Sequence, residues 1–252
     1  VATALALADA ARPVTLRYFR SPDLAADNKL AGGFDPVTAA DREAEAAMRG
    51  VLAVMRPEDA VFGEEMGRTA GTSGLTWVLD PVDGTRAFLS GTPTWGVLIA
   101  VGDENGPRAG IIDQPFVGER FFGGFGQAWT DGPMGRRDLR TRPARPLAEA
   151  MLFTTFPEVG SAVERAAFDD LASRVRLTRY GMDCYAYALV ASGQIDLVVE
   201  AGLQAYDVQG PIAVIEAAGG VVTDWQGGPA HNGGRILAAA NAGIYAAALE
   251  VL

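Results

Sequence analysis

Two aspartates separated by Pro81 and Val82 stand directly after a short apolar segment. The run Trp77–Leu79 is bounded and apolar, and Asp80 and Asp83 follow it. The run predicts a buried strand, and the next residues predict a helical turn, since aspartate can cap a helix and proline suits its first position. Residues three apart share one face of such a turn, so both carboxylates can converge. Two ionised carboxylates repel each other unless a cation lies between them.

Oxygen ligands of this kind suit Mg²⁺ or a similar hard ion. The same turn also offers free backbone N–H groups, which can hold a phosphate. A metal ion and a phosphate at one strand end together predict a phosphoester hydrolase.

Three further acidic positions stand beside predicted elements. Glu64 belongs to a glutamate pair after a short apolar run, Glu200 ends an apolar run, and Asp207 begins a predicted helix. Each has an ordinary structural explanation, such as a solvated loop pair or a helix N-cap. Taken singly, the structural explanation is favoured for these three, whereas the paired aspartates favour a metal.

The residues exclude several other phosphatase chemistries. A haloacid-dehalogenase-type site needs a nucleophilic aspartate two positions before its Asp-Gly-Thr, where this chain has Pro81. A cysteine phosphatase needs an arginine six positions after its cysteine, but Val190 stands there after Cys184. A histidine nucleophile would have to be His231, the only histidine, so no second histidine could assist it. The sequence also contains no Gly-Lys-Ser/Thr phosphate loop. The chemistry left open is attack by a water molecule that a metal ion activates.

The elements that must position these residues alternate along the second half of the chain. The sequence predicts helices at 1–19 (broken or restarted at Pro13), 38–55, 161–174, 183–191, 207–217 and 242–252. It predicts strands at 77–79, 96–101, 109–112, 119–122, 127–130, 151–155, 195–200, 221–225 and 236–240, and loops at 21–35 and 66–75. Such alternation predicts a layered α/β architecture. The Pro- and Arg-rich segment 131–148 predicts a boundary between an N-terminal α+β lobe, 1–135, and a C-terminal α/β lobe, 136–252.

The charge, apolar content and cysteine count of the chain limit which classes of binding partner and which compartment are expected. The chain has 252 residues, is 49% hydrophobic and carries a formal net charge of −10. This acidic balance argues against nucleic acid or an anionic membrane as the main partner. No apolar run approaches the roughly 20 residues that span a bilayer, and the apolar start is expected to form a surface helix rather than a signal peptide. The single Cys184 excludes an internal disulfide and fits a reducing cytoplasm.

The acidic motifs, taken together, resemble the signature set of the inositol monophosphatase family in order and spacing. The matching segments are Pro36-Val37-Thr38 with Asp41, Gly63-Glu64-Glu65, Asp80-Pro81-Val82-Asp83-Gly84-Thr85, and Tyr206-Asp207 with Glu216-Ala217-Ala218-Gly219-Gly220. The resemblance covers essentially the whole chain. It implies an αβαβα sandwich that is dimeric and depends on two or three Mg²⁺ ions, with both lobes forming one catalytic unit.

The resemblance also implies a role for each matching position. It assigns metal binding to Glu64, Asp80, the Val82 carbonyl, Asp83 and Asp207, and phosphate binding to the backbone of Gly84 and Thr85. It assigns orientation of the attacking water to the Thr85 hydroxyl with Glu64 and Asp41, and contact with the rest of the substrate to Glu200. The implied hydrolysis proceeds in line, without a covalent enzyme intermediate.

Two further stretches resemble the histidinol-phosphate phosphatase branch of the family. They are Phe88-Leu89-Ser90-Gly91 through Gly110–Pro115 and Glu119-Arg120, and Arg179–Tyr187. Histidinol phosphate carries an ammonium and an imidazole, with which Asp183 and Glu200 could pair, whereas inositol asks only for hydroxyl hydrogen bonds. A helix cap is an equal alternative for Asp183. The chain departs from the branch at Asp35, where serine is usual, and in a longer segment after Lys29.

The sequence therefore predicts a Mg²⁺-dependent histidinol-phosphate phosphatase of histidine biosynthesis, acting on a small phosphate monoester. The alternative within the same chemistry is an inositol 1-monophosphatase or a broad sugar phosphatase. A nucleotide 3′-phosphatase is disfavoured, because no basic cluster offers a place for a second phosphate. The alternative of another class is a non-catalytic metal- or phosphate-binding regulatory protein.

Overall fold

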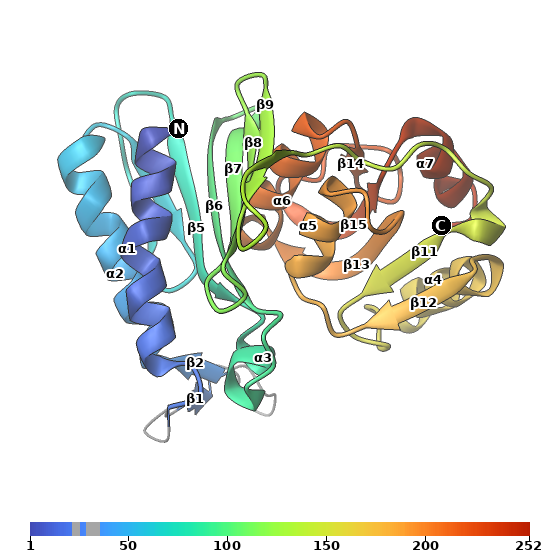
Figure 1. Ribbon diagram of the computed structural model, residues 1–252, viewed down its shortest axis with the longest axis horizontal. Helices are drawn as coiled ribbons and strands as arrows, with labels where there is room; N and C mark the ends of the chain where they lie inside the picture. Colours follow the sequence, from blue (N-terminus) through green and yellow to red (C-terminus); the bar gives the residue numbers. More distant parts are fainter. Residues whose placement is uncertain (22–25, 29–35) are drawn as a thin grey trace.

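The computed structural model describes residues 1–21, 26–28 and 36–252. Figure 1 shows these elements arranged in alternating helical and sheet layers. Lys29 and Asp35, at which the sequence departs from the related branch, lie outside the described residues.

The larger sheet has eight strands. Across the sheet they are β10 (Arg137–Asp138), β9 (Gln127–Asp131), β8 (Glu119–Gly124), β7 (Gly106–Gln114), β6 (Gly96–Asp103), β5 (Thr76–Asp83), β3 (Ala60–Gly63) and β4 (Gly67–Thr69). Neighbouring strands run antiparallel except β3 and β5, which are parallel. The carboxyl ends of β3 and β5 therefore lie at the same edge of the sheet, where Glu64 follows β3 and Asp83 ends β5.

The second sheet has five strands. Across the sheet they are β12 (Leu177–Tyr180), β11 (Met151–Thr154), β13 (Leu197–Gln204), β15 (Gly233–Ala239) and β14 (Val221–Thr223). A separate pair is formed by β1 (Ala26–Asn28) and β2 (Pro36–Thr38). The predicted lobe boundary at 135/136 falls just before β10, which extends the first sheet, and the division into lobes remains a prediction.

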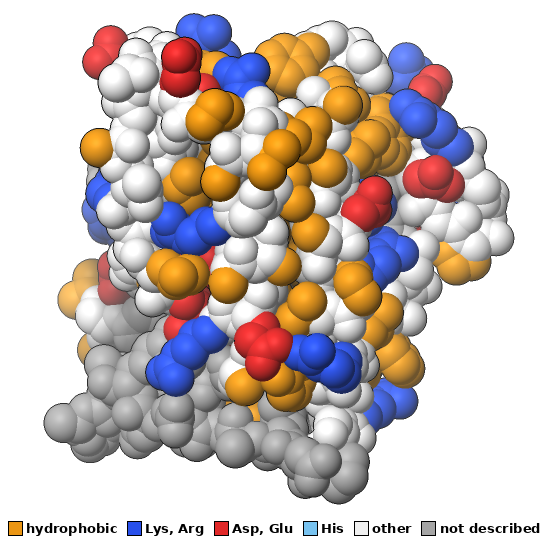
Figure 2. All heavy atoms as spheres, turned by 90° about the vertical axis from the view of Figure 1, so that its left-hand side faces the viewer, with side chains coloured by type: hydrophobic (Ala, Val, Ile, Leu, Met, Phe, Trp, Pro, Cys, Tyr) orange, Lys and Arg blue, Asp and Glu red, His pale blue; other side chains and the backbone are white. Residues whose placement is uncertain are grey.

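Seven α-helices of the described chain cover these sheets. They are α1 (Ala2–Tyr18), α2 (Ala39–Met55), α3 (Thr85–Ser90), α4 (Ala162–Arg174), α5 (Tyr185–Ala191), α6 (Ala205–Ala217) and α7 (Ala242–Leu249), with a 3₁₀ turn at Leu147–Glu149. Helices α1 and α2 cover the outer face of the first sheet, as Figure 1 shows. On their exposed side, basic, acidic and apolar side chains are interspersed (Figure 2). Among the described residues, no helix has the length and apolar character that a bilayer span requires.

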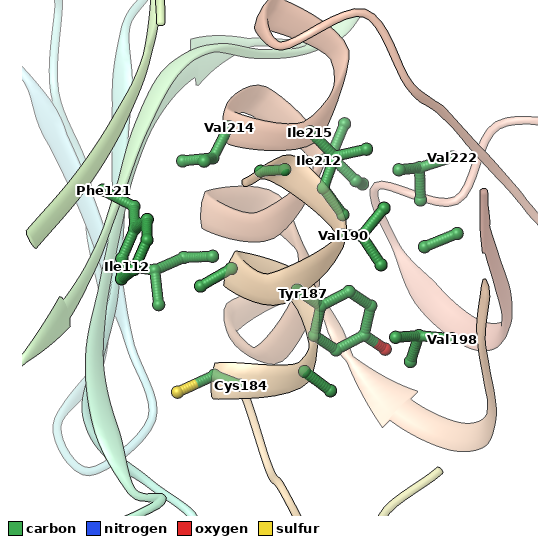
Figure 3. Close-up of a cluster of buried hydrophobic side chains, with 14 of the residues drawn as sticks. Ile112, Phe121, Cys184, Tyr187, Val190, Val198, Ile212, Val214, Ile215 and Val222 are labelled. Atoms are coloured by element: carbon green, nitrogen blue, oxygen red, sulfur yellow. The ribbon is translucent and has the colours of Figure 1, made fainter. Parts of the chain in front are cut away.

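The apolar core follows the layers. Between α1, α2 and the first sheet, Leu7 and Met48 pack in one cluster with Ile99. Between the two sheets, α5 and α6 fill a second cluster, drawn in Figure 3, in which Ile112 and Phe121 of the first sheet approach the helices from one side and Val198 of the second sheet from the other. A third cluster packs α4 and α7 on the far face of the second sheet. The predicted αβαβα sandwich is therefore confirmed.

Glycines bring α6 unusually close to the first sheet. A Cβ at Gly123 on β8 would lie 2.4 Å from the carbonyl oxygen of Ala213, and one at Gly110 on β7 would lie 2.6 Å from that of Gly210. Only glycine leaves room for this approach of backbone to backbone. Helix α6, which carries Asp207 in its first turn, thus packs directly on β7 and β8.

The predicted break of the first helix at Pro13 is wrong. Helix α1 runs from Ala2 to Tyr18 with Pro13 inside it. Residues on both sides of the proline, among them Leu7, Ala11 and Thr15, are buried on one packed face. Because packing against α2 and the sheet stabilises both halves in one line, it outweighs the hydrogen bond that proline cannot donate.

The predicted helical turn at Asp80 and Pro81 is also wrong. Strand β5 continues through Asp83, and α3 begins at Thr85 after Gly84, which has φ +83°. Asp80 pairs with Leu98 while Asp83 pairs with Gly96, so the register shifts by one residue between them. This bulge, and not a helix, brings the two carboxylates onto one side.

Other differences concern short or edge elements. The predicted loop at 66–75 contains strand β4, which pairs with β3, and the loop at 21–35 contains β1. The sequence does not predict strand β12, because its exposed position at the sheet edge leaves it without an apolar pattern. Asp207 is not the N-cap of α6: it lies three residues inside, and its carboxylate accepts from the N–H of the cap residue Gln204 at 2.6 Å.

Candidate active site

A cavity of about 380 Å³ opens where the end of β5, the start of α3, the start of α5 and the end of β13 meet. It brings together every predicted site residue except Asp41. The lining includes Glu64, Asp80, Val82, Asp83, Gly84, Thr85, Asp183, Glu200 and Asp207. Asp41 lies buried on α2, outside the lining. The roles assigned to these residues stay predictions, but their convergence from positions 64 to 207 is a property of the fold.

Three carboxylates form a tight cluster in this cavity. One oxygen each from Asp80, Asp83 and Asp207 lie within 4.8 Å of one another. The bulge of β5 supplies the first two, and the first turn of α6 supplies the third. Backbone N–H groups orient them: that of Val82 donates to Asp80 at 3.1 Å, and that of Cys184 donates to Asp83 at 2.7 Å.

Burial and mutual repulsion make this cluster electrostatically costly. Burial, followed by the charges of Glu64, Asp83, Asp207 and Asp41, raises the pKa of Asp80 well above its usual value. Burial also raises the pKa of Asp83, with Asp183 and Asp207 adding to the shift. The pKa of Asp207 rises to about 6, chiefly through burial. Ionised carboxylates so close together suit a divalent cation with oxygen ligands. The donor set therefore fits Mg²⁺.

Gly84 and Thr85 line the cavity where the chain passes from the end of β5 into α3. Gly84 is the residue before the helix, and its left-handed backbone lets the carboxyl of Asp183 pack against it: a Cβ there would lie 2.7 Å from Asp183 Cγ. The Thr85 hydroxyl donates to the Val82 carbonyl at 3.3 Å. Threonine is therefore held beside the carbonyl that the family resemblance assigns to a metal.

Asp183 and Glu200 add two buried carboxylates to the same cavity. Asp183 accepts from the Thr94 hydroxyl at 2.6 Å, and burial raises its pKa. Glu200 accepts from the Thr155 N–H at 2.7 Å and the Thr154 hydroxyl at 3.1 Å. Burial raises the pKa of Glu200 to about 7 despite these donors. The cap alternative for Asp183 is wrong, because its side chain bonds Thr94 and the cap position of α5 belongs to Cys184.

Several residues of the site were missed by sequence reasoning. Gln114, fully buried, donates to the sulfur of Cys184 at 3.3 Å, and thus supports the residue whose N–H holds Asp83. Arg86 lies over the ring of Phe156 at 4.7 Å, and both line the cavity. These partners come from distant parts of the chain, so no local pattern could reveal them. Arg86 alone had a signal, because it directly follows the Gly-Thr of the acidic motif.

Comparison with known proteins gives a consistent result. The model of the inositol monophosphatase family matches residues 1–252. A bifunctional phosphatase IMPL2, chloroplastic, of Arabidopsis thaliana is 41% identical over 224 residues, which cover 88% of this chain and 63% of that one. A histidinol-phosphatase of Mycobacterium tuberculosis is 34% identical over 93% of this chain and 91% of its own length. A solved inositol monophosphatase from Zymomonas mobilis has a TM-score of 0.87 at 39% identity, covering 99% of this chain and 96% of that one.

Proposed function

The chain belongs to the inositol monophosphatase family as a phosphoric monoester hydrolase, and we propose that it hydrolyses L-histidinol phosphate to L-histidinol in histidine biosynthesis. The chain spans 63% of the length of its Arabidopsis relative. The proposal therefore rests on the cavity of this chain itself. We also propose that it acts as a homodimer, as the family resemblance implies, and in the cytoplasm, which its single cysteine fits. Sedimentation of the purified protein would test the dimer.

Glu64, Asp80, the Val82 carbonyl, Asp83 and Asp207 would hold Mg²⁺, in two or three sites. When bound, the metal offsets phosphate charge, lowers the pKa of a bound water and stabilises the leaving alkoxide. The backbone N–H groups of Gly84 and Thr85 bind the phosphate. The Thr85 hydroxyl orients the attacking water together with Glu64 and Asp41, whose charges both act on Asp80.

The pair of Asp183 and Glu200 in the same cavity carries the choice of substrate. Both are buried carboxylates beside the acidic cluster, and ionising either of them without a counter-charge costs free energy. The ammonium of histidinol phosphate supplies that charge, and charge-assisted hydrogen bonds are the stronger class. The exposed ring of Phe156 adds an aromatic surface for the imidazole.

An inositol-type phosphatase is the second candidate. The solved relative from Zymomonas mobilis is an inositol monophosphatase at 39% identity. Carboxylates can also accept hydrogen bonds from the hydroxyl groups of inositol. Comparing the two substrates decides between the candidates.

The test measures phosphate release with Mg²⁺ from histidinol phosphate and inositol 1-phosphate side by side. A large preference in kcat/KM for histidinol phosphate supports the proposal. Equal or reversed values would assign the chain to the inositol-type phosphatases, and release from neither would contradict both candidates.

The substitution Asp183→Asn separates charge from contact. The amide oxygen can still accept from Thr94, so the variant removes the negative charge while the local hydrogen bond stays possible. We expect kcat/KM for histidinol phosphate to fall by about tenfold to a hundredfold, the range of a lost hydrogen bond between charged groups. The value for inositol 1-phosphate should change far less. A similar loss on both substrates would remove Asp183 from substrate discrimination.

A further inference from the structure

Helix α2 carries two buried carboxylates one helical turn apart, and the second has no role in the site described so far. Glu45 is 0% exposed and does not line the cavity. A charge so deeply buried needs close partners to offset its desolvation. Three donors reach its carboxylate: the N–H of Glu65 at 2.7 Å, the N–H of Met66 at 3.2 Å and Nε of Arg49 at 2.7 Å.

These contacts surround Glu64 on both sides. Before it, Gly63 packs so tightly that a Cβ there would lie 2.1–2.6 Å from the Glu45 carboxylate atoms. After it, Glu65 and Met66 donate their N–H groups to that carboxylate. Arg49 adds contacts to β4, the strand that pairs with β3: it donates to the Gly67 carbonyl at 2.5 Å and to the Thr69 hydroxyl at 2.9 Å.

Glu64 needs such a hold because its neighbours repel it. Its charge acts on Asp80 strongly enough to raise the pKa of that residue. Like charges at short range push the turn after β3 away from the end of β5. The N–H of Glu64 gives one opposing contact, to the Leu79 carbonyl at 3.1 Å. The carboxylate of Glu45 holds the following two residues.

We propose that Glu45, with Arg49, is a positioning residue that fixes the turn from Gly63 to Met66 and thereby holds the Glu64 carboxylate at the acidic cluster. The inference rests on the proposed function, because that function assigns Glu64 to a metal. Helix α2 then serves the site twice, since one of its turns places Asp41 near the cluster and the next controls where Glu64 lies.

The first variant is Glu45→Gln, with Mn²⁺ as the probe. Glutamine keeps the shape but has only one acceptor oxygen, so at least one of the three contacts is lost. We expect the dissociation constant for Mn²⁺, measured from the electron-spin-resonance signal of the free ion, to rise by about tenfold to a hundredfold, as for other outer partners of metal ligands. Phosphate release should show the same shift in its Mg²⁺ requirement.

The second variant reaches the same contact from the other side. Gly63→Ala places its methyl group against the carboxylate of Glu45 and should weaken Mn²⁺ binding comparably. In an E45A background the carboxylate is gone, so adding Gly63→Ala should cost little more. This non-additivity is expected only if the two residues act through one contact.

Asp59→Asn is the matched control. Asp59 is also buried and lies at the opposite end of β3, where it accepts from Trp77 Nε1 at 2.8 Å and from Arg56 at 2.6 Å. Its loss should lower the melting temperature but leave Mn²⁺ binding unchanged. If Glu45→Gln and Gly63→Ala also lower only the melting temperature, the inference is overturned while the function stands. A wild-type chain that binds no Mn²⁺ would overturn the proposed function and this inference with it.

Discussion

At the scale of residues, the site is a group of carboxylates whose pKa values burial raises above their ordinary range. Glu200 is the clearest case outside the metal cluster, because burial raises its pKa to about 7 although two donors favour the charged form. The folded protein therefore holds this proton more strongly than the unfolded chain does. Between the ordinary pKa of 4.5 and about 7, the Glu200 contribution to stability falls as the pH rises.

The substitution Glu200→Gln should remove this part of the pH dependence. In metal-free protein with a chelator, the free energy of unfolding of the wild type should drop more steeply between pH 5 and 7.5 than that of the variant, by up to about 3 kcal/mol. Chemical denaturation at each pH measures the difference. Glu250→Gln at the exposed end of α7 is the control, and parallel pH profiles for the wild type and Glu200→Gln would contradict the prediction.

Sequence reasoning found the acidic residues of the cavity but not what holds them. The paired aspartates and the later Asp207 stand in motifs that can be recognised locally. The partner of Asp183 is Thr94, 89 positions away, and Cys184 donates its N–H to Asp83 across 101 positions. A short motif carries the chemistry, whereas the contacts that orient it depend on which strands and helices become neighbours.

At the scale of elements, the long helices and the strands with apolar runs were predictable, and the irregularities were not. The bulge between Asp80 and Asp83 arises from pairing with β6, so the sequence of β5 alone cannot show it. Similarly, Pro13 predicts a break by its own chemistry, but packing of α1 on both sides of it decides otherwise. In both cases a tertiary contact overrides a correct local preference.

The close approach of α6 to β8 predicts that replacing Gly123 destabilises the protein. Gly123→Ala should destabilise the protein by about 1–3 kcal/mol or more, because its Cβ would lie 2.4 Å from backbone atoms of Ala213 and Val214 that cannot move singly. Gly50→Ala is the opposite control. It lies exposed on α2 with nothing within 4 Å of a new Cβ, so it should stabilise by about 0.5–1 kcal/mol through helix propensity. Thermal denaturation distinguishes the two signs.

At the scale of the whole molecule, the two sheets share one middle layer. Helices α5 and α6 contribute Tyr187, Val208 and Ile212 to a cluster that also contains residues of both sheets. Asp207 at the start of α6 joins the aspartates of β5 at the cavity. If this layer came away from either sheet, the apolar faces of that sheet and of the helices would be exposed to water.

The shared layer predicts one cooperative unfolding transition. Calorimetry of the metal-free protein should give a single peak whose calorimetric and van't Hoff enthalpies agree. Two separated peaks would show instead that the proposed lobes, 1–135 and 136–252, unfold independently. Adding Mg²⁺ should move the single peak to higher temperature, since binding to the folded state stabilises it.

The order of elements along the chain also bears on how the protein is made. All eight strands of the first sheet are complete by Asp138, but α6, which covers their inner face, begins at Ala205, after β11, α4, β12, α5 and β13. At roughly 5–20 residues per second, a ribosome needs several seconds to synthesise this interval. For most of that time Leu98, Ile112 and Phe121 are covered neither by α5, which begins at Tyr185, nor by α6. The nascent chain thus exposes an apolar sheet face, to which chaperones that shield apolar surface can bind.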